Sequence, residues 1–183
     1  MTLEKLLTLV DLAMRSDVPE SILNYCGEYF SRYYMLMHFL AMDVTTGICV
    51  ELGVESGRAS NAMLLAGATV VGVDNNESRR DVLKGNPNFT MIIGSSLPVP
   101  EEISRRGKVI SLLHIDTEHS FSQARNEFEA YKPYLRDGAV VLFDDTNAME
   151  GEVLRYLNSL PYEKFVDDRL HESCGFGGMI YRE

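Results

Sequence analysis

Residues 109–146 read VISLLHIDTEHSFSQARNEFEAYKPYLRDGAVVLFDDT. Two apolar runs, 109–115 and 138–143, enclose a polar segment, and acidic residues follow each run. Both runs are typical of buried parallel strands, whose neighbouring ends lie about 5 Å apart in a sheet. Asp116 and Asp144 could therefore bind one cation, with His119 beside them. The stretch predicts a metal and a base at the carboxyl edge of a sheet.

The same alternation continues toward both ends of the chain. Further short apolar runs occupy 47–52, 68–73, 88–93, 162–166 and 177–182, and helical patterns occupy 60–65, 78–83, 120–131 and 153–160. Helices alternating with continuously apolar strands predict an α/β fold, in which a parallel sheet is covered on both faces. Ligands of such sheets bind beyond the carboxyl ends of the strands, where every motif below falls.

Two helices are expected before the first strand. Apolar residues follow helical spacing over 3–14 and again over 22–40, and Asp17 with Glu20 has the spacing of a capping box. We expect residues 1–45 to form a helical extension or lid and 46–183 to form one globular domain. The tyrosines at positions 25, 29, 33 and 34 could line a pocket, or this segment could pack on the sheet or on a second subunit.

A glycine turn follows the first strand. Gly53 and Gly57 lie four residues apart after Glu51, a sparser pattern than the GxGxxG that a dinucleotide pyrophosphate favours. The turn suits a ligand without phosphate, and an ordinary strand-to-helix turn is the alternative. Asp74 ends the second strand, where an acid can bind a ribose hydroxyl or simply cap a helix. Ser95 could border an adenine or belong to a loop turn.

The acidic residues after the last two strands of the opening stretch suit a hard cation. Asp116, Asp144 and Asp145 offer the oxygen ligands that Mg²⁺ prefers. Such an ion can lower the pKa of a bound hydroxyl, and a neutral His119 could then accept the proton. Helix caps and a structural histidine are the alternatives. We expect His38 and His114 to be packing residues, whereas His171 lies in a loop that could reach the site.

Composition narrows the class of protein. Asp and Glu total 27 against 17 Lys and Arg, a net charge of −10 without a basic cluster, which disfavours nucleic acid as a partner. Three scattered cysteines without a CxxC pair favour free thiols in a reducing compartment. Charged residues interrupt the apolar N-terminus, and no apolar run approaches membrane-spanning length. These features predict a cytoplasmic protein without a membrane partner.

The assembled motifs resemble those of the class I S-adenosylmethionine-dependent methyltransferases. ELGVESGRAS (51–60) is similar to their first motif, and VVGVDNN (70–76) to their second-strand acid. The stretch 114–146 resembles metal-dependent small-molecule O-methyltransferases, above all methyltransferase family 24, which includes antibiotic-sugar O-methyltransferases and relatives labelled cephalosporin hydroxylases. The resemblance covers roughly 47–146. It implies a Rossmann-like, doubly wound sheet of seven strands, mostly parallel with an antiparallel last strand, and helices on both faces.

The resemblance also implies roles for individual residues. It places Glu51, Gly53, Gly57, Asp74, Ser95 and Asp116 around S-adenosylmethionine, and Asp116, Asp144 and Asp145 around Mg²⁺ or a similar ion. His119 would be the catalytic base, working with Asp116. Catechol-type relatives have a lysine where His119 stands, which favours an aliphatic or sugar hydroxyl as acceptor. Ser95 stands where many relatives have an acid near the adenine.

The sequence thus predicts a metal-dependent O-methyltransferase that acts on a hydroxyl of a small molecule, of sugar or natural-product type. The N-terminal helices could also join subunits in a homo-oligomer. Three alternatives remain at this point: an NAD-dependent oxidoreductase, a nucleic-acid methyltransferase, and a protein of degenerate methyltransferase fold that binds cofactor or partner without turnover. The glycine spacing disfavours the first, and the net charge of −10 disfavours the second.

Overall fold

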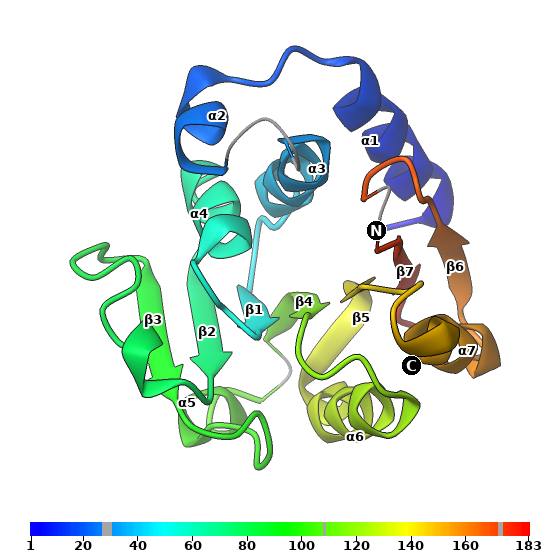
Figure 1. Ribbon diagram of the computed structural model, residues 1–183. Helices are drawn as coiled ribbons and strands as arrows, with labels where there is room; N and C mark the ends of the chain where they lie inside the picture. Colours follow the sequence, from blue (N-terminus) through cyan, green and yellow to red (C-terminus); the bar gives the residue numbers. More distant parts are fainter. Residues whose placement is uncertain (27–30, 108, 172–173) are drawn as a thin grey trace.

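The computed structural model describes residues 1–26, 31–107, 109–171 and 174–183 (Figure 1). Its helices are α1 (Leu3–Arg15), α2 (Glu20–Cys26), α3 (Ser31–Met42), α4 (Arg58–Leu65), α5 (Glu101–Ser104), α6 (Phe121–Tyr131) and α7 (Glu152–Ser159). Its strands are β1 (Ile48–Leu52), β2 (Val70–Asp74), β3 (Phe89–Ile93), β4 (Ile110–Ile115), β5 (Leu135–Asp144), β6 (Glu163–Val166) and β7 (Phe176–Ile180). Short 3-10 turns occupy Glu77–Arg79, Lys132–Tyr134 and Met149–Gly151.

The seven strands form one sheet in the order β3-β2-β1-β4-β5-β7-β6. The pairs from β3 to β5 are parallel, and β7 runs antiparallel to both β5 and β6. The order reverses between β1 and β4, which is the switch point where ligands of open α/β sheets bind. The predicted class, a Rossmann-like, mostly parallel sheet with an antiparallel last strand, is confirmed.

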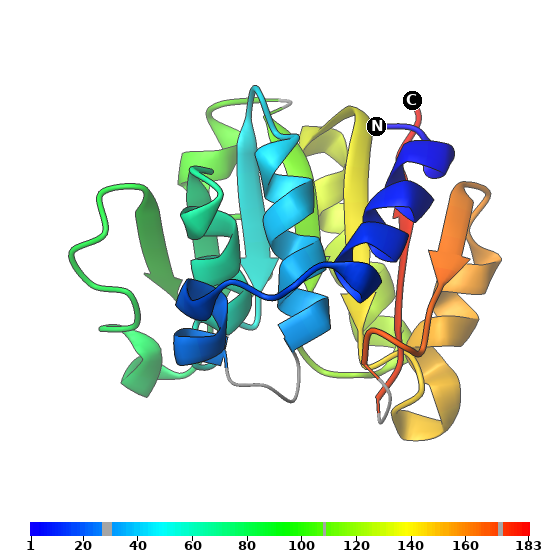
Figure 2. The ribbon, with the colours of Figure 1, turned by 90° about the horizontal axis from the view of Figure 1, so that it is seen from above.

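Helices cover both faces of the sheet in three layers (Figures 1 and 2). Neighbouring strand residues point to opposite faces, so Leu112 packs under α1, α3 and α4, whereas Leu113 packs over α5, α6 and α7. Each face therefore has its own apolar core. Among the described residues, no helix combines the length and the apolar character that crossing a membrane requires.

The N-terminal helices belong to the first of these cores. Leu6 of α1 and Leu36 and Leu40 of α3 are buried together with the sheet residues Cys49 and Leu142. The residues expected to form one helix up to position 40 form two, α2 and α3. Gly27, a poor helix former, follows the end of α2 in the sequence. Of the apolar residues predicted in that stripe, Tyr29 and Phe30 lie outside the described residues, as does the side chain of Cys26.

One predicted helix, 78–83, is wrong. The structure has a single 3-10 turn at Glu77–Arg79, begun by the side chain of Asn76, which accepts a hydrogen bond from the backbone N–H of Ser78. Leu83 has a φ of 54°, and an α-helix cannot contain that left-handed conformation. Local hydrogen bonding by Asn76 and the backbone at Leu83 thus override the weak helical pattern.

Candidate active site

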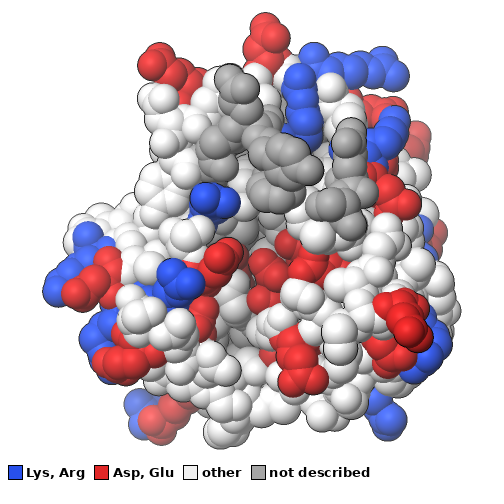
Figure 3. Space-filling view, viewed as in Figure 1, with Lys and Arg blue, Asp and Glu red and all other residues white. Residues whose placement is uncertain are grey.

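A cavity of about 720 Å³ opens at the carboxyl ends of the strands, over the switch point. Its lining comes from the ends of β1, β2 and β4 and from the segments after β3, β4 and β5: Gly53, Glu55, Val73, Asp74, Asn75, Gly94, Ser95, Ser96, Asp116, Thr117, Glu118, His119, Gln123 and Asp145. Acidic side chains gather in the hollow at the centre of this face (Figure 3). The cavity is the place where both predicted ends of the site, the nucleoside end and the metal end, meet.

The glycine turn brings two strand ends into contact. Gly53 has a φ of +84°, and a Cβ atom there would lie 1.7 Å from the carbonyl oxygen of Asp116. A glycine is therefore required for the close approach of β1 to β4. Gly57, with a φ of +78°, precedes α4. Gly57 and Glu51 are absent from the described lining of the cavity, whereas Gly53 belongs to it.

Asp74 lies at the predicted nucleoside end of the cavity. Its carboxylate accepts hydrogen bonds from the backbone N–H of Glu55, 2.9 Å away, and of Asn76, 2.8 Å away. These bonds join the glycine turn to the end of β2 and orient the carboxylate, which keeps lone pairs for a further donor. Ser95 also lines the cavity, and its hydroxyl oxygen accepts a hydrogen bond from the N–H of Leu97.

Asp116, His119 and Asp145 form a cluster at the metal end. Nε2 of His119 is 2.9 Å from Oδ2 of Asp145 and 3.8 Å from Oδ1 of Asp116. The neighbouring carboxylates of Asp116 and Asp145 raise the pKa of His119 to about 10. Asp145 has a φ of 52°, a left-handed conformation that non-glycine residues adopt mainly where function or tight turns require it.

Asp144 points to a different neighbour from the one expected. It is buried, and its Oδ1 accepts a hydrogen bond from Nδ1 of His171, 3.0 Å away. It nevertheless remains close to Asp116, because Asp116, Asp144 and His114 offer ligand atoms within 4.8 Å of one another. Asp116 thus lies between the two other carboxylates that the sequence predicted as metal ligands.

The chemistry of these residues fits a divalent cation. Burial raises the pKa of Asp116 to about 6, the hydrogen bond with His119 opposes that rise, and the nearby charge of Asp144 adds to it. Carboxylates crowded together in a partly buried site are the donors that bind Mg²⁺ or Mn²⁺. Asp116 belongs to two groups of potential ligand atoms, one with His119 and Asp145 and one with His114 and Asp144, and the atoms of each group lie within 4.8 Å of one another.

The comparison with known families agrees with this geometry. The model of methyltransferase family 24, described as a methyltransferase domain, matches residues 50–146, more than half of the 183 residues. The chain belongs to this methyltransferase family. The resemblance predicted from the motifs and the enzyme class, an S-adenosylmethionine-dependent methyltransferase, are confirmed. No curated protein sequence matches the chain.

Solved structures share the fold of this methyltransferase. The TDP-rhamnose 3'-O-methyltransferase CalS11 of calicheamicin biosynthesis is 18% identical, with 98% of this chain and 94% of that chain covered and a TM-score of 0.66. The O-methyltransferase TomG from Streptomyces achromogenes, solved with S-adenosylmethionine, is 16% identical, fully covered on both sides, with a TM-score of 0.68. A Bacillus cereus O-methyltransferase, solved with S-adenosylhomocysteine, is 14% identical, with coverage of 100% and 92% and a TM-score of 0.62.

His114, predicted as a packing residue, is buried in this methyltransferase and also belongs to a polar network. His114 is buried, its Nε2 is hydrogen-bonded to the hydroxyl of Tyr33, and its Nδ1 is 3.4 Å from Oε1 of Glu51. Glu51 in turn accepts a hydrogen bond from the hydroxyl of Ser60. Tyr33 stacks on His171, with ring centroids 5.7 Å apart. Polar partners inside a strand give no periodic signal, so the sequence pattern could not reveal this network.

The four tyrosines that could line a pocket do not share one environment. Tyr33 and Tyr34 of α3 are buried, and Tyr25 of α2 is exposed with its hydroxyl 3.4 Å from the carbonyl oxygen of Ser56. None of these three is among the described residues that line the cavity. The fourth tyrosine of the prediction, at position 29, lies outside the described residues.

Sequence reasoning also missed Glu127. This carboxylate of α6 is buried and accepts hydrogen bonds from the hydroxyls of Ser96 and Thr117, at 2.6 and 2.7 Å, and from the amide of Gln123, at 2.9 Å. All three donors line the cavity. Glu127 therefore ties the loop after β3 to the loop after β4. On a helix with charged neighbours such as Arg125 and Glu129, one more Glu gives no signal of its own.

Proposed function

We propose that this methyltransferase transfers a methyl group from S-adenosylmethionine to a hydroxyl of a small molecule and that it depends on a divalent cation. The observation that carries the proposal is the convergence of Asp116, His119 and Asp145 in the cavity that also contains Asp74. A ribose-binding acid and a metal-binding cluster at one sheet edge suit this reaction class better than hydrolysis or dehydrogenation.

The nucleoside end of the cavity would bind the cofactor. In the proposal, Asp74 accepts hydrogen bonds from the ribose hydroxyls, and Gly53 allows the cofactor to approach the backbone of the turn. Ser95, which lines the cavity, would border the adenine in this proposal. Glu51 and Gly57 would contribute to cofactor binding only indirectly, by supporting the glycine turn, because both lie outside the described lining of the cavity. The structures of TomG with S-adenosylmethionine and of the Bacillus cereus enzyme with S-adenosylhomocysteine support this cofactor.

The metal end would activate the acceptor. Asp116, Asp144 and Asp145 would hold Mg²⁺ or a similar ion, which when bound lowers the pKa of a hydroxyl and orients it. His119 would accept the hydroxyl proton at Nε2. Its hydrogen bonds to Asp116 and Asp145 favour the imidazolium, so His119 can act as a base only when these carboxylates have another positive partner. The acceptor oxygen would attack the methyl carbon in line with the sulfonium, whose C–S electron pair would leave with S-adenosylhomocysteine, and positioning would supply much of the rate.

The acceptor class follows from the site and its relatives. A histidine base and a metal suit an aliphatic or sugar hydroxyl, and the structurally similar CalS11 is a methyltransferase of TDP-rhamnose. We further propose a cytoplasmic enzyme whose residues 1–45 cover the sheet next to the site and could join a second subunit. A binding-only protein is the alternative, and it predicts cofactor affinity without product.

Removal of the metal tests the proposal. Chelator-treated enzyme should bind S-adenosylmethionine in calorimetry yet form no S-adenosylhomocysteine with a panel of sugar and natural-product hydroxyl acceptors, and added Mg²⁺ or Mn²⁺ should restore turnover. Full activity in thoroughly chelated enzyme would contradict the metal dependence. Cofactor affinity without product from any acceptor, with or without metal, would favour the binding-only alternative.

A further inference from the structure

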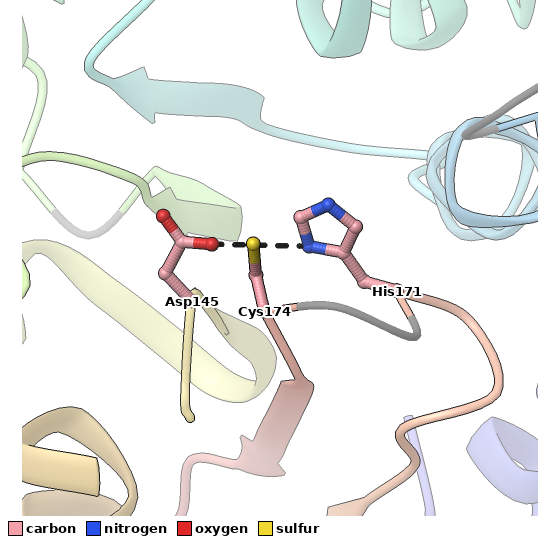
Figure 4. Close-up of side chains that lie close together, drawn as sticks. All are labelled: Asp145, His171 and Cys174. Carbon is pink, nitrogen blue, oxygen red and sulfur yellow. Dashed lines mark ion pairs between the residues drawn. The ribbon is translucent and has the colours of Figure 1, made fainter. Parts of the chain in front are cut away.

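The loop between β6 and β7 places a thiol beside Asp145. Cys174 lies next to the carboxylate of Asp145 and the imidazole of His171 (Figure 4). One ligand atom from each of the three residues lies within 4.8 Å of the others, and Nδ1 of His171 is 4.0 Å from Oδ1 of Asp145. The three side chains come from two segments, the end of β5 and the β6–β7 loop.

Backbone hydrogen bonds hold these segments together. The N–H of Gly175 donates to the carbonyl oxygen of His171 at 2.8 Å, and the N–H of Cys174 donates to the same oxygen at 3.3 Å, so Cys174 lies close to His171. The N–H of Asn147 donates to the carbonyl oxygen of Cys174 at 2.7 Å and ties this segment to the end of β5. Gly175 has a φ of +76°, and a Cβ there would lie 2.5 Å from Oγ1 of Thr146. The close contact between the two segments is therefore built into the backbone.

The two carboxylate oxygens of Asp145 face different side chains. Oδ2 is 2.9 Å from Nε2 of His119 in the cavity, whereas Oδ1 is the oxygen that faces His171. Asp145 can thus complete a ligand set on the Cys174 side that is distinct from the oxygen-rich cluster on the Asp116 side.

The donor set on the Cys174 side selects a different kind of cation. Thiolate, imidazole and carboxylate are zinc ligands, and Mg²⁺ disfavours sulfur. Zinc bonds of about 2.0–2.3 Å require donor atoms roughly 3.3–3.8 Å apart, so the observed spacing needs only small side-chain shifts. We infer that His171, Cys174 and Asp145 form a second metal site, which takes a thiolate-preferring cation such as Zn²⁺ and adjoins the acceptor site through Asp145. Binding there displaces the thiol proton and the proton that Nδ1 of His171 shares with Asp144.

Cobalt provides a readout that needs neither cofactor nor acceptor, so its result is independent of the proposed methyl transfer. The full chain, stripped with chelator, is titrated with Co²⁺ and followed by absorption. We expect a thiolate-to-cobalt charge-transfer band in the near ultraviolet that saturates at one equivalent. Cys174→Ser should abolish the band, and His171→Ala should weaken Co²⁺ binding more than about tenfold, since even the loss of outer partners of a metal site costs that much. Far-ultraviolet circular dichroism checks that each variant is folded.

Two matched variants test whether the absorption band comes from the thiolate of Cys174. Cys49→Ala removes a buried thiol outside the cluster, and His119→Ala alters only the Asp116 side of Asp145, so both should keep the band. A band that survives Cys174→Ser, or one that is lost in Cys49→Ala, would overturn the assignment. So would saturable Co²⁺ binding without any thiolate band.

A second measurement uses the unaltered protein and therefore holds even if a variant fails to fold. Zn²⁺ should protect Cys174 from alkylation by iodoacetamide at least about tenfold, because a thiolate that is bound to zinc is a weaker nucleophile. Mg²⁺ at the same concentration should not protect it, because Mg²⁺ does not bind sulfur well. Peptide mass spectrometry measures the modified fraction at Cys174. Equal alkylation with Zn²⁺ and with Mg²⁺ would refute the second metal site.

Discussion

At the scale of single residues, the proposed general base His119 has a position that can be tested directly. It lies between two carboxylates, 2.9 Å from Asp145 and 3.8 Å from Asp116. We expect His119→Ala to lower kcat about 10²- to 10⁴-fold, the usual contribution of a general base, while cofactor affinity changes little. Steady-state kinetics with saturating Mg²⁺ measures the effect. His38→Gln is the control, because His38 is bonded to the carbonyl oxygen of Ala62, away from the cavity, and it should retain near-normal kcat.

Asp74 is the residue whose loss should affect the cofactor alone. An Asn side chain has one acceptor oxygen where the two N–H groups of Glu55 and Asn76 require two, and its amide would face one of them. We expect Asp74→Asn to weaken S-adenosylmethionine binding about ten- to a hundredfold, since hydrogen bonds to a charged group contribute about 1.5–3 kcal/mol. Calorimetry decides, with the exposed Asp81→Asn as control. Equal affinities in both variants would remove Asp74 from the cofactor site.

Individual residues were predictable from the sequence only where a strand end placed them. Asp116, His119 and Asp145 line one cavity as the strand ends imply. The contact between His171 and Asp144 was out of reach, because it depends on the antiparallel pairing of β7 with β5, which sets Phe176 opposite Asp144. The residues around His171 and Asp144 do not by themselves predict how β5 and β7 pair.

At the scale of elements, the glycine turn after β1 has a sharp test. Gly53→Ala would place a methyl group 1.7 Å from the carbonyl oxygen of Asp116, on top of a positive φ. Gly67→Ala has the same φ penalty, at +86°, but no atom within 4 Å of the new Cβ. The control should cost about 1 kcal/mol of unfolding free energy and Gly53→Ala at least about 2 kcal/mol more, because β1 and β4 must separate. Urea denaturation measures the unfolding free energy of both variants. Equal losses of unfolding free energy would mean that the backbone around Gly53 shifts at little cost to accept a Cβ atom.

Elements were predictable where several signals agreed. Helix α6 begins after Ser120, whose hydroxyl accepts from the N–H of Gln123, as the capping spacing implies. The segment 78–83 had only a short periodic pattern, and the conformation of Leu83 prevents a helix there. The stripe over 22–40 predicted one helix where the described residues contain two, α2 and α3, and the residues between these helices lie outside the described part of the chain.

At the scale of the whole molecule, one core joins the N-terminal helices to the sheet. Leu6 is 0% exposed and packs in the core that contains Leu112 and Leu142, whereas its neighbour Leu7 is 45% exposed. We expect Leu6→Ala to lower the free energy of unfolding by about 2–5 kcal/mol in one cooperative transition, and Leu7→Ala to stay within about 0.5 kcal/mol of the parent. A separate early transition for residues 1–45, with the main transition unchanged, would instead identify a detachable lid.

The sheet was predictable as a whole because buried parallel strands give continuous apolar runs, and each of the seven expected runs contains or overlaps a strand. The antiparallel direction of the last strand came only from the family resemblance, since an apolar run gives no direction to its strand. Its place between β5 and β6 was not predicted. The position of the N-terminal helices on the α4 side of the sheet depends on complementary surfaces and could not be inferred from either segment alone.

The antiparallel strand β7 has an evolutionary consequence. A parallel connection needs a long crossover that must pack on the sheet, whereas β6 and β7 pair antiparallel and are joined by the loop that carries His171 and Cys174. Changing the length of such a loop costs little closure entropy, since doubling a loop adds only about 0.6 kcal/mol. Homologues can therefore exchange this loop, and with it His171 and Cys174, while the cofactor half stays untouched. Grafting this loop between family members would test whether it sets the metal preference that we propose for the Cys174 site.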